Sequence, residues 1–319
     1  MKRPALFGEI HRPSPFPILL ALALLACLPP ARAADPDPVF ERELALYDYR
    51  DTRKLVRAVR SAAQLLEQRG TNAFETMQAS PKTWNNDLFY VYVYAMDGLC
   101  LYHPAAPEFL GRNLLEVADA DGRLALRMAL DAVDDPDNPH GWLHYLWHPA
   151  GGFNPVPKSS CHFAATLPDG RRVIVGGGME YPPEERLFAR FAVDAAVRLL
   201  ADNGSAGLAA IARPATKFRF RDVKVFVMDE SGNALVDPAL DSIASRNLSS
   251  FHDAAGHAPF EQIVRKLKES DRCWEVMLAR NRYQRVMEKK VVYARRGSMD
   301  GSNVVVGAAT SLPRPIWSK

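Results

Sequence analysis

The hydrophobic positions of this chain follow a helical period first and a strand period afterwards. Between residues 55 and 66 the apolar positions recur at helical spacing, Arg and Glu occupy the other face, and Gly70 follows. This pattern predicts one long helix over residues 40–69, because one face can be buried while the other stays in water. Residues 89–96 form an aromatic and β-branched run, which predicts a strand.

The segments that follow predict an antiparallel sheet. Asp97 and Gly98 form a turn signal, after which residues 100–102 run back. A short helix over 124–133 and a Gly/Pro-rich hairpin over 149–157 are predicted around further strands, at 142–147, 159–167 and 172–176. One long helix, two strands, a short helix and three strands are typical of an α+β fold with the long helix behind the sheet.

The chain then repeats itself. Residues 90–97 lead through Gly98 to a His-Pro pair and an Arg-Asn-Leu triplet, and residues 223–229 lead through Gly232 to an Asp-Pro pair and the same triplet. The spacing is 132 residues between Met96 and Met228 and 134 residues from the Pro pair onward. We interpret the difference as a two-residue insertion in the turn after the aspartate.

A repeat of this length is a whole domain. We therefore expect two modules, the first over residues 34–183 and the second over residues 184–319. The double proline at 182–183 breaks the chain between them, and a second long helix is expected to begin directly afterwards at Leu187.

The first 33 residues have the pattern of an export signal. Lys2, Arg3 and Arg12 form a charged start, residues 16–28 are apolar, and Ala31-Arg32-Ala33 gives a cleavage site. The apolar segment is too short to span a membrane. We expect cleavage before Ala34 and a soluble periplasmic protein; the alternative is a lipoprotein anchored at Cys27, because residues 24–27 resemble a lipoprotein box.

Charge and cysteine content narrow the class of protein. Four of the 40 basic and one of the 37 acidic residues lie in the predicted signal, so the remainder carries 36 of each. A neutral chain lacks the basic footprint of a nucleic-acid binder. The three remaining cysteines, Cys100, Cys161 and Cys273, are an odd number, so we expect free buried thiols.

Several motifs occur in the order found in one known family. After the Met-Asp-Gly turn come His103-Pro104, residues 111–114, Gly141-Trp142-x-x-Tyr145-x-Trp147, Pro157-Lys158-Ser159-Ser160 and Val173-Ile174-Val175-Gly176-x-Gly178. This order resembles the Cache superfamily of extracytoplasmic sensor domains, in its single-Cache, second-type form. The resemblance is good over residues 40–180 and weaker over 187–312.

The resemblance implies a fold and a function. Each module would be PAS-like, with a curved antiparallel sheet backed by a long helix. The chain would be a stand-alone tandem periplasmic sensor that binds a small organic ligand and acts through a membrane signalling or transport protein. Neither enzymatic activity nor a cofactor is expected from the family.

The predicted strands suggest a ligand pocket. Alternate residues of a strand share a face, so Tyr92 and Tyr94 point together, as do Tyr145 and Trp147. Lys158 would add a point charge at the rim for a carboxylate, and Ser160 a hydroxyl. The same aromatic residues could instead simply pack the core, and both interpretations stay open.

Two neighbouring positions leave the ligand undefined. His103 stands at the family's His-Pro position, where it would either line the pocket rim or hold the loop. The family commonly has an aromatic residue where this chain has Cys161, which puts in doubt which ligand would fit.

The alternative function is a periplasmic enzyme or a redox or metal protein that uses Cys161 and the histidines. His140, His144 and His148 are four residues apart, but a predicted strand would not bring them to one metal. Ser160 and His162 share a strand face without a group to orient the histidine as in a triad. Residues 176–178 are three glycines, yet the dinucleotide-binding pattern around them is missing.

The second module lacks the pocket signature. Trp274 remains, but a charged stretch over residues 280–285 replaces the Tyr-x-Trp and Pro-Lys-Ser motifs. We therefore expect this module to be degenerate and not to bind the ligand. Its basic hairpin is a candidate partner contact, or alternatively a solvated face, and contains Arg280, Arg282, Arg285, Lys289 and Lys290.

Overall fold

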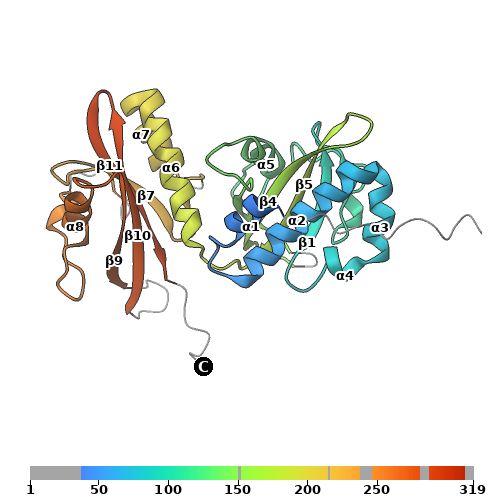
Figure 1. Ribbon diagram of the computed structural model, residues 1–319, viewed down its shortest axis with the longest axis horizontal. Helices are drawn as coiled ribbons and strands as arrows, with labels where there is room; N and C mark the ends of the chain where they lie inside the picture. The colour runs from blue at the N-terminus through green and yellow to red at the C-terminus, as the bar shows by residue number, and fades with distance from the viewer. Residues whose placement is uncertain (1–36, 150–151, 215, 238–245, 281–286, 313–319) are drawn as a thin grey trace, which may run out of the picture. The chain divides into compact units, whose positions relative to one another are not determined.

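The computed structural model has the predicted α+β architecture, with two antiparallel sheets and their helices (Figure 1). It describes residues 37–149, 152–214, 216–237, 246–280 and 287–312; the predicted signal and Cys27 lie outside them. The first sheet has five strands in the order β2-β1-β5-β4-β3. Their bounds are Tyr90–Ala95 for β1, Cys100–Tyr102 for β2, Leu143–Trp147 for β3, Val156–Thr166 for β4 and Arg172–Glu180 for β5.

The second sheet repeats this order as β6-β7-β11-β10-β9, with β8 paired to β7. Its longest strand is β10, which pairs with β11 on one side and with β9 on the other. The bounds are Arg219–Phe220 for β6, Val223–Asp229 for β7, Ala234–Val236 for β8, Arg272–Arg280 for β9, Met287–Met299 for β10 and Ser302–Ser311 for β11.

Each sheet packs against one long helix and one short helix. Helix α2, Arg50–Arg69, packs on β4 and β5 through its apolar face, and α5, Ala125–Val133, packs near β3 and β4. In the second sheet the corresponding helices are α6, Arg186–Asn203, and α8, Pro259–Lys266. The short helices α3, Ala73–Ala79, α4, Pro81–Trp84, and α7, Gly207–Ala212, were not predicted from the sequence.

The prediction of a single helix over 40–69 is wrong. Helix α1, Pro38–Leu44, ends before a turn in which Tyr47 is buried, and α2 starts only at Arg50. The buried carboxylate of Glu185 accepts hydrogen bonds from the backbone N–H groups of Asp48 and Tyr49, at 2.6 and 3.1 Å. A side chain far along the chain thus supports the start of α2, and no local pattern announces it.

The glycines of β5 explain how tightly α2 approaches the sheet. The prediction of a strand over 172–176 was too short, since β5 continues through Gly176, Gly177 and Gly178. A Cβ atom on Gly177 would lie 2.6 Å from Val59 of α2, whereas Cβ atoms on its two neighbours would strike side chains on the opposite face. The three glycines therefore make room on both faces of the central strand.

The strand pairing corrects the expected insertion in the repeat. The irregularity in β1 lies between Val93 and Tyr94, and its counterpart in β7 lies between Val227 and Met228. The partners in the next strand, Cys100 and Ala234, are equally separated. The spacing is therefore 134 residues throughout this hairpin, Met96 and Met228 are not equivalent, and the turn contains no insertion.

Candidate functional site

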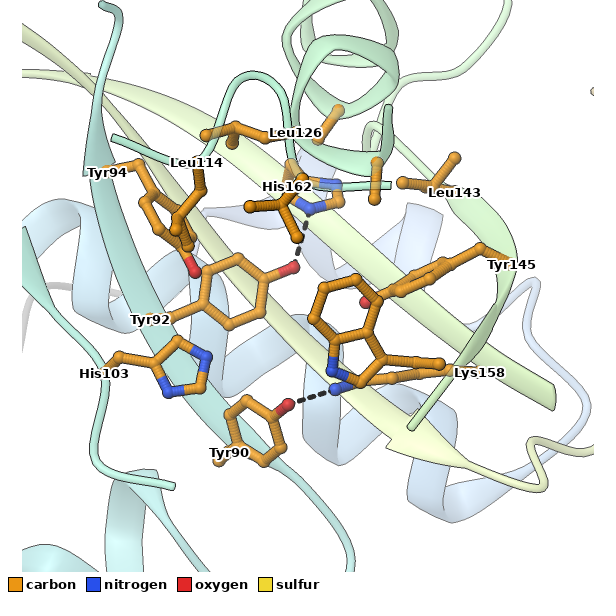
Figure 2. A pocket seen from close by; sticks show the side chains of 14 residues that line it. Tyr90, Tyr92, Tyr94, His103, Leu114, Leu126, Leu143, Tyr145, Lys158 and His162 are labelled. Atoms are coloured by element: carbon orange, nitrogen blue, oxygen red, sulfur yellow. Dashed lines mark hydrogen bonds between the residues drawn. The ribbon is translucent and has the colours of Figure 1, made fainter. Parts of the chain in front are cut away.

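One cavity of the first sheet collects most of the predicted ligand-binding residues. It lies between the sheet face opposite α2 and helix α5, and its volume is about 50 Å³. Six of the seven predicted residues line it, and Figure 2 shows five of them by label. The six are Tyr92, Tyr94, His103, Tyr145, Trp147 and Lys158.

Successive side chains of β4 point to opposite faces of the sheet, and this decides which of them reach the cavity. Lys158 and His162 line it, and Ser160 lies just behind the lining, where its Oγ is 2.9 Å from the hydroxyl oxygen of Tyr145. Cys161 is paired with Gly177 and is fully buried on the α2 side. The departure from the family at Cys161 therefore does not alter the cavity wall, contrary to the expectation from sequence.

Lys158 is buried rather than placed at the rim as expected. Only 1% of its surface is exposed, and its ammonium nitrogen donates to the hydroxyl of Tyr90 and sits 4.0 Å from the centre of that ring. Burial lowers the pKa of Lys158 to about 7, against a smaller opposing effect of Glu180. Among the residues that the structure describes, no carboxylate forms an ion pair with it.

His103 both lines the cavity and holds its loop. Its Nδ1 accepts a hydrogen bond from the backbone N–H of Ala106 at 2.9 Å, and its ring is stacked on Tyr92 with centroids 5.6 Å apart. Burial, with the nearby Lys158 charge, lowers the pKa of His103 to about 4. The imidazole is therefore neutral near pH 7, and both alternatives left open by the sequence apply.

His162 is a lining residue that the site prediction omitted. Its Nε2 lies 2.9 Å from the hydroxyl oxygen of Tyr92 (Figure 2). Its Nδ1 lies 2.7 Å from the carbonyl oxygen of Gly141. Burial lowers its pKa to about 4. The signal was present in the sequence, since His162 has the same strand parity as Lys158 and Ser160.

The other omitted residues form the apolar part of the wall. Tyr90 has the parity of Tyr92 and Tyr94 and could have been predicted. The remaining positions come from the 114–117 loop, from α5 and from the start of β3, whose packing against the sheet depends on tertiary structure. They are Leu114, Val117, Ala125, Leu126, Ala129 and Leu143.

The corresponding place in the second sheet is an ordinary core. Tyr92 and His162 both pair with Gly176, and in the same way Phe226 and Ala294 pair with Gly307. Counting from these pairs, Val292 replaces Ser160. Phe226, Val292 and Ala294 belong to one buried apolar cluster, together with Met228, Phe260 and Ile263.

The alternative enzyme, redox or metal site would use Cys161 and the histidines. Cys100 and Cys161 are buried and Cys273 is half-buried, all as free thiols, and burial raises the pKa of each. His144 faces away from the cavity, as predicted, with its ring stacked on Phe220. Within the described ranges, no group of three or more His, Cys, Asp or Glu side chains could hold a metal ion.

A five-stranded antiparallel sheet with a long helix on one face and a small cavity on the other is a PAS-like architecture. Residues 53–180 match the family described as Single Cache domain 2. This segment of the chain is therefore a Cache domain of the second single type, as its motifs indicated. No curated protein matches the chain.

Several solved structures are similar to the chain. A periplasmic sensor domain of a chemotaxis protein is 23% identical, over 46% of this chain and 99% of its own, with a TM-score of 0.34. A Cache chemosensory domain described by its carboxylic acid recognition is 22% identical, over 41% and 93%, with a TM-score of 0.31. The ligand-binding domain of a Pseudomonas fluorescens chemoreceptor in complex with L-isoleucine is 13% identical, over 85% and 87%, with a TM-score of 0.30.

Proposed function

We propose that the first module binds a small carboxylate in the cavity beside Lys158 and that the protein is a sensor rather than an enzyme. The observation that carries the proposal is the buried ammonium group. A buried charge is costly unless it is paired, and Lys158 has a tyrosine hydroxyl but no carboxylate within ion-pairing distance among the described residues. A bound carboxylate would supply the missing counter-charge.

The size of the cavity limits the ligand. A volume of 50 Å³ accommodates roughly three to five water-sized groups. Aromatic rings form most of the wall near Lys158, so the remainder of the ligand would be short and largely apolar. Carboxylates of two or three carbon atoms meet both conditions.

Calorimetric titration with propanoate tests the proposal, with a matched pair of lysine variants. Lys290 of β10 is the counterpart of Lys158, because each lies four residues before the residue that pairs with the matching glycine, His162 with Gly176 or Ala294 with Gly307. We expect K158M to abolish propanoate binding and K290M to leave it unchanged. Equal affinity of K158M and the unaltered protein would show that the cavity is not the binding site.

The output of such a sensor requires a second protein. Binding in one module can act only through a difference in affinity of the bound and free states for a partner. A membrane signalling or transport protein is the proposed partner, with the basic hairpin of the second module as the proposed contact. Lys290 is half-buried beside Glu288 and Asp222, while residues 281–286, including Arg282 and Arg285, lie outside the described residues, as does the side chain of Arg280.

Pull-downs with and without propanoate test this output. A membrane protein recovered in only one of the two conditions would support a ligand-gated contact. Recovery of the same protein equally in both conditions would favour a passive binding role.

Cache domains of this type are periplasmic sensor domains, and we propose the same compartment for this protein. None of the helices in the described part of the chain is long and apolar enough to cross a membrane. Export would use residues 1–33 as a cleaved signal. N-terminal sequencing of the exported protein should begin at Ala34, and a lipid-modified start at Cys27 would contradict this.

A further inference from the structure

The side chain of Lys158 reaches Tyr90 by lying across the central strand of the sheet. Strand β5 separates β4, which carries Lys158, from β1, which carries Tyr90. Tyr90 pairs with Gly178 of β5, and a Cβ atom on that glycine would lie 2.7 Å from Cε of Lys158. Because Gly178 has no side chain, the lysine passes over β5 and its nitrogen contacts the hydroxyl and the ring of Tyr90 (Figure 2). The geometry therefore fixes the nitrogen in the wall of the cavity.

This position favours the uncharged amine. Lys158 is buried, and among the described residues no carboxylate lies within ion-pairing distance of it. A desolvated ammonium without a counter-charge loses its proton readily. With a pKa of about 7, roughly half of Lys158 is uncharged at pH 7, against less than about one in a thousand of an exposed lysine. A neutral amine in an apolar pocket is a nucleophile towards carbonyl carbon.

The titratable groups around Lys158 come from several neighbouring elements. Tyr145 of β3 and Glu180 of β5 pair with it in register, and Tyr90 and His103 lie beside it in the cavity wall. Burial raises the pKa of both tyrosines and lowers the pKa of His103 to about 4, so all three are uncharged at pH 7. Only the exposed Glu180 favours the charged form of the lysine.

With the amine uncharged, the cavity suits an uncharged carbonyl compound. Among the described residues that line the cavity, Lys158 is the only lysine or arginine, and the two histidines are neutral. The volume of about 50 Å³ admits only a short molecule. We propose that Lys158 captures short aldehydes as a reversible imine, with the hydroxyl of Tyr90 exchanging the proton. This capture does not require the carboxylate site.

The covalent step needs no other reactant. The lone pair of Nζ forms a bond to the carbonyl carbon, and the π electrons of the carbonyl group move to its oxygen. That oxygen gains a proton from the Tyr90 hydroxyl, and the nitrogen returns one to Tyr90. Loss of water from the resulting carbinolamine gives the imine, so one amine and one aldehyde yield one imine and one water. No electrons are exchanged, and water reverses the reaction.

Reductive trapping with propanal and cyanoborohydride at pH 7 tests the inference. The protein that begins at Ala34 is treated, digested and mapped by mass spectrometry, which separates Lys158 from the reactive α-amino group. We expect a propyl group on Lys158, formed at least about tenfold faster than on Lys290. The ion pairs of Lys290 with Glu288 and Asp222 keep that matched lysine charged.

Two variants give readouts that depend on the geometry around Lys158. Y90F removes the hydroxyl that exchanges the proton and should slow labelling of Lys158 about tenfold or more, whereas Y102F makes the same change outside the cavity and should not. E180Q removes the charge that favours the ammonium form. At pH 6 it should label Lys158 at least about twofold faster and leave the rate at the α-amino group of Ala34 unchanged.

The outcomes separate this inference from the carboxylate site. Calorimetric binding of propanoate without a propyl group on Lys158 would overturn aldehyde capture and leave the carboxylate site standing. Trapping at Lys158 in a protein that does not bind propanoate would do the reverse. Labelling of Lys158 no faster than Lys290 would also overturn the capture, and this comparison within the unaltered protein holds even if a variant does not fold.

Discussion

Lys158 of β4 and Lys290 of β10 occupy equivalent positions in the two sheets, but among the described residues only Lys290 forms ion pairs with carboxylates. Its ammonium nitrogen lies 3.3 Å from Glu288 and 3.7 Å from Asp222 and is partly exposed. Lys158 faces a cavity of tyrosines, whereas the face of the second sheet is filled by a buried apolar cluster. The duplicated fold thus keeps a lysine in both modules, and within the described ranges only the second lysine has an ion-pair partner.

Ligand affinity should fall with rising pH because of Lys158. In the empty cavity its pKa is about 7, and a bound carboxylate would favour the charged form. Below pH 7 the lysine is already protonated and the affinity for propanoate should be constant. Above pH 7 binding must add a proton, so the affinity should drop about tenfold per pH unit. His103 and His162, with pKa values near 4, stay neutral from pH 6 to 9 and contribute nothing to the slope.

Calorimetry at pH 8.5 in two buffers with different ionisation enthalpies checks this directly. The apparent binding enthalpies should differ by an amount that corresponds to uptake of nearly one proton. The same enthalpy in both buffers at this pH would mean that Lys158 is charged before the ligand arrives.

The ligand-free protein should become more stable as pH rises above 7. The pKa of Lys158 is about 7 in the folded state and about 10.4 in an unfolded chain, so the unfolded state binds more protons between these values. Stability therefore rises with pH over this window, by about 1.4 kcal/mol per pH unit at most. Urea unfolding of the unaltered protein and K158M at pH 7, 8 and 9 measures the effect as the difference between the two.

K158M should be at least as stable as the unaltered protein at pH 7, because it replaces an unpaired buried ammonium by an apolar side chain of similar size. The advantage of K158M should shrink as pH increases. A difference that is independent of pH would contradict the low pKa of Lys158.

The sequence predicted those elements whose formation depends on residues close together in the chain. The apolar stripe of α2, the strand parity of Tyr92 and Tyr94, and the turn at Asp97-Gly98 are all present. The break between α1 and α2 was missed because it depends on Glu185, more than a hundred residues away in the chain. The depth of Lys158 was missed for a similar reason, since the residue that its ammonium group contacts, Tyr90, lies on another strand.

The register of the repeat was misread for a different reason. Met96 and Met228 precede similar residues, and matching them by type suggested an insertion. Hydrogen bonding instead makes Gly98 and Gly232 equivalent, because each donates its N–H to the residue three positions earlier, Ala95 or Asp229. Residue identity at a turn is a weaker guide than the pairing of the strands that it joins.

The cysteines should be unreactive in the folded protein. Cys100 and Cys161 are buried and Cys273 is half-buried, and burial raises the pKa of all three thiols, which keeps them protonated at neutral pH. The experiment uses the protein that begins at Ala34. Iodoacetamide at pH 7.5 should modify Cys273 before the other two cysteines, and modification of all three should require urea. Rapid labelling of Cys161 in the native protein would revive the alternative of a thiol-based enzyme.

A methyl group at Gly178 should damage the ligand site specifically. A Cβ atom there would lie 2.3 Å from Oγ of Ser160 and 2.7 Å from Cε of Lys158, so both side chains must move. We expect G178A to lose about 1–3 kcal/mol of stability through overpacking and to lose most of its affinity for propanoate. G297A is the matched control, because Gly297 is also a buried strand glycine but its Cβ would come no closer than 3.4 Å to any neighbour. The free energy of unfolding of G297A should lie within about 1 kcal/mol of that of the unaltered protein, and G297A should bind propanoate normally. If G178A binds as tightly as G297A, the position of the lysine side chain beside β5 is not what the cavity depends on.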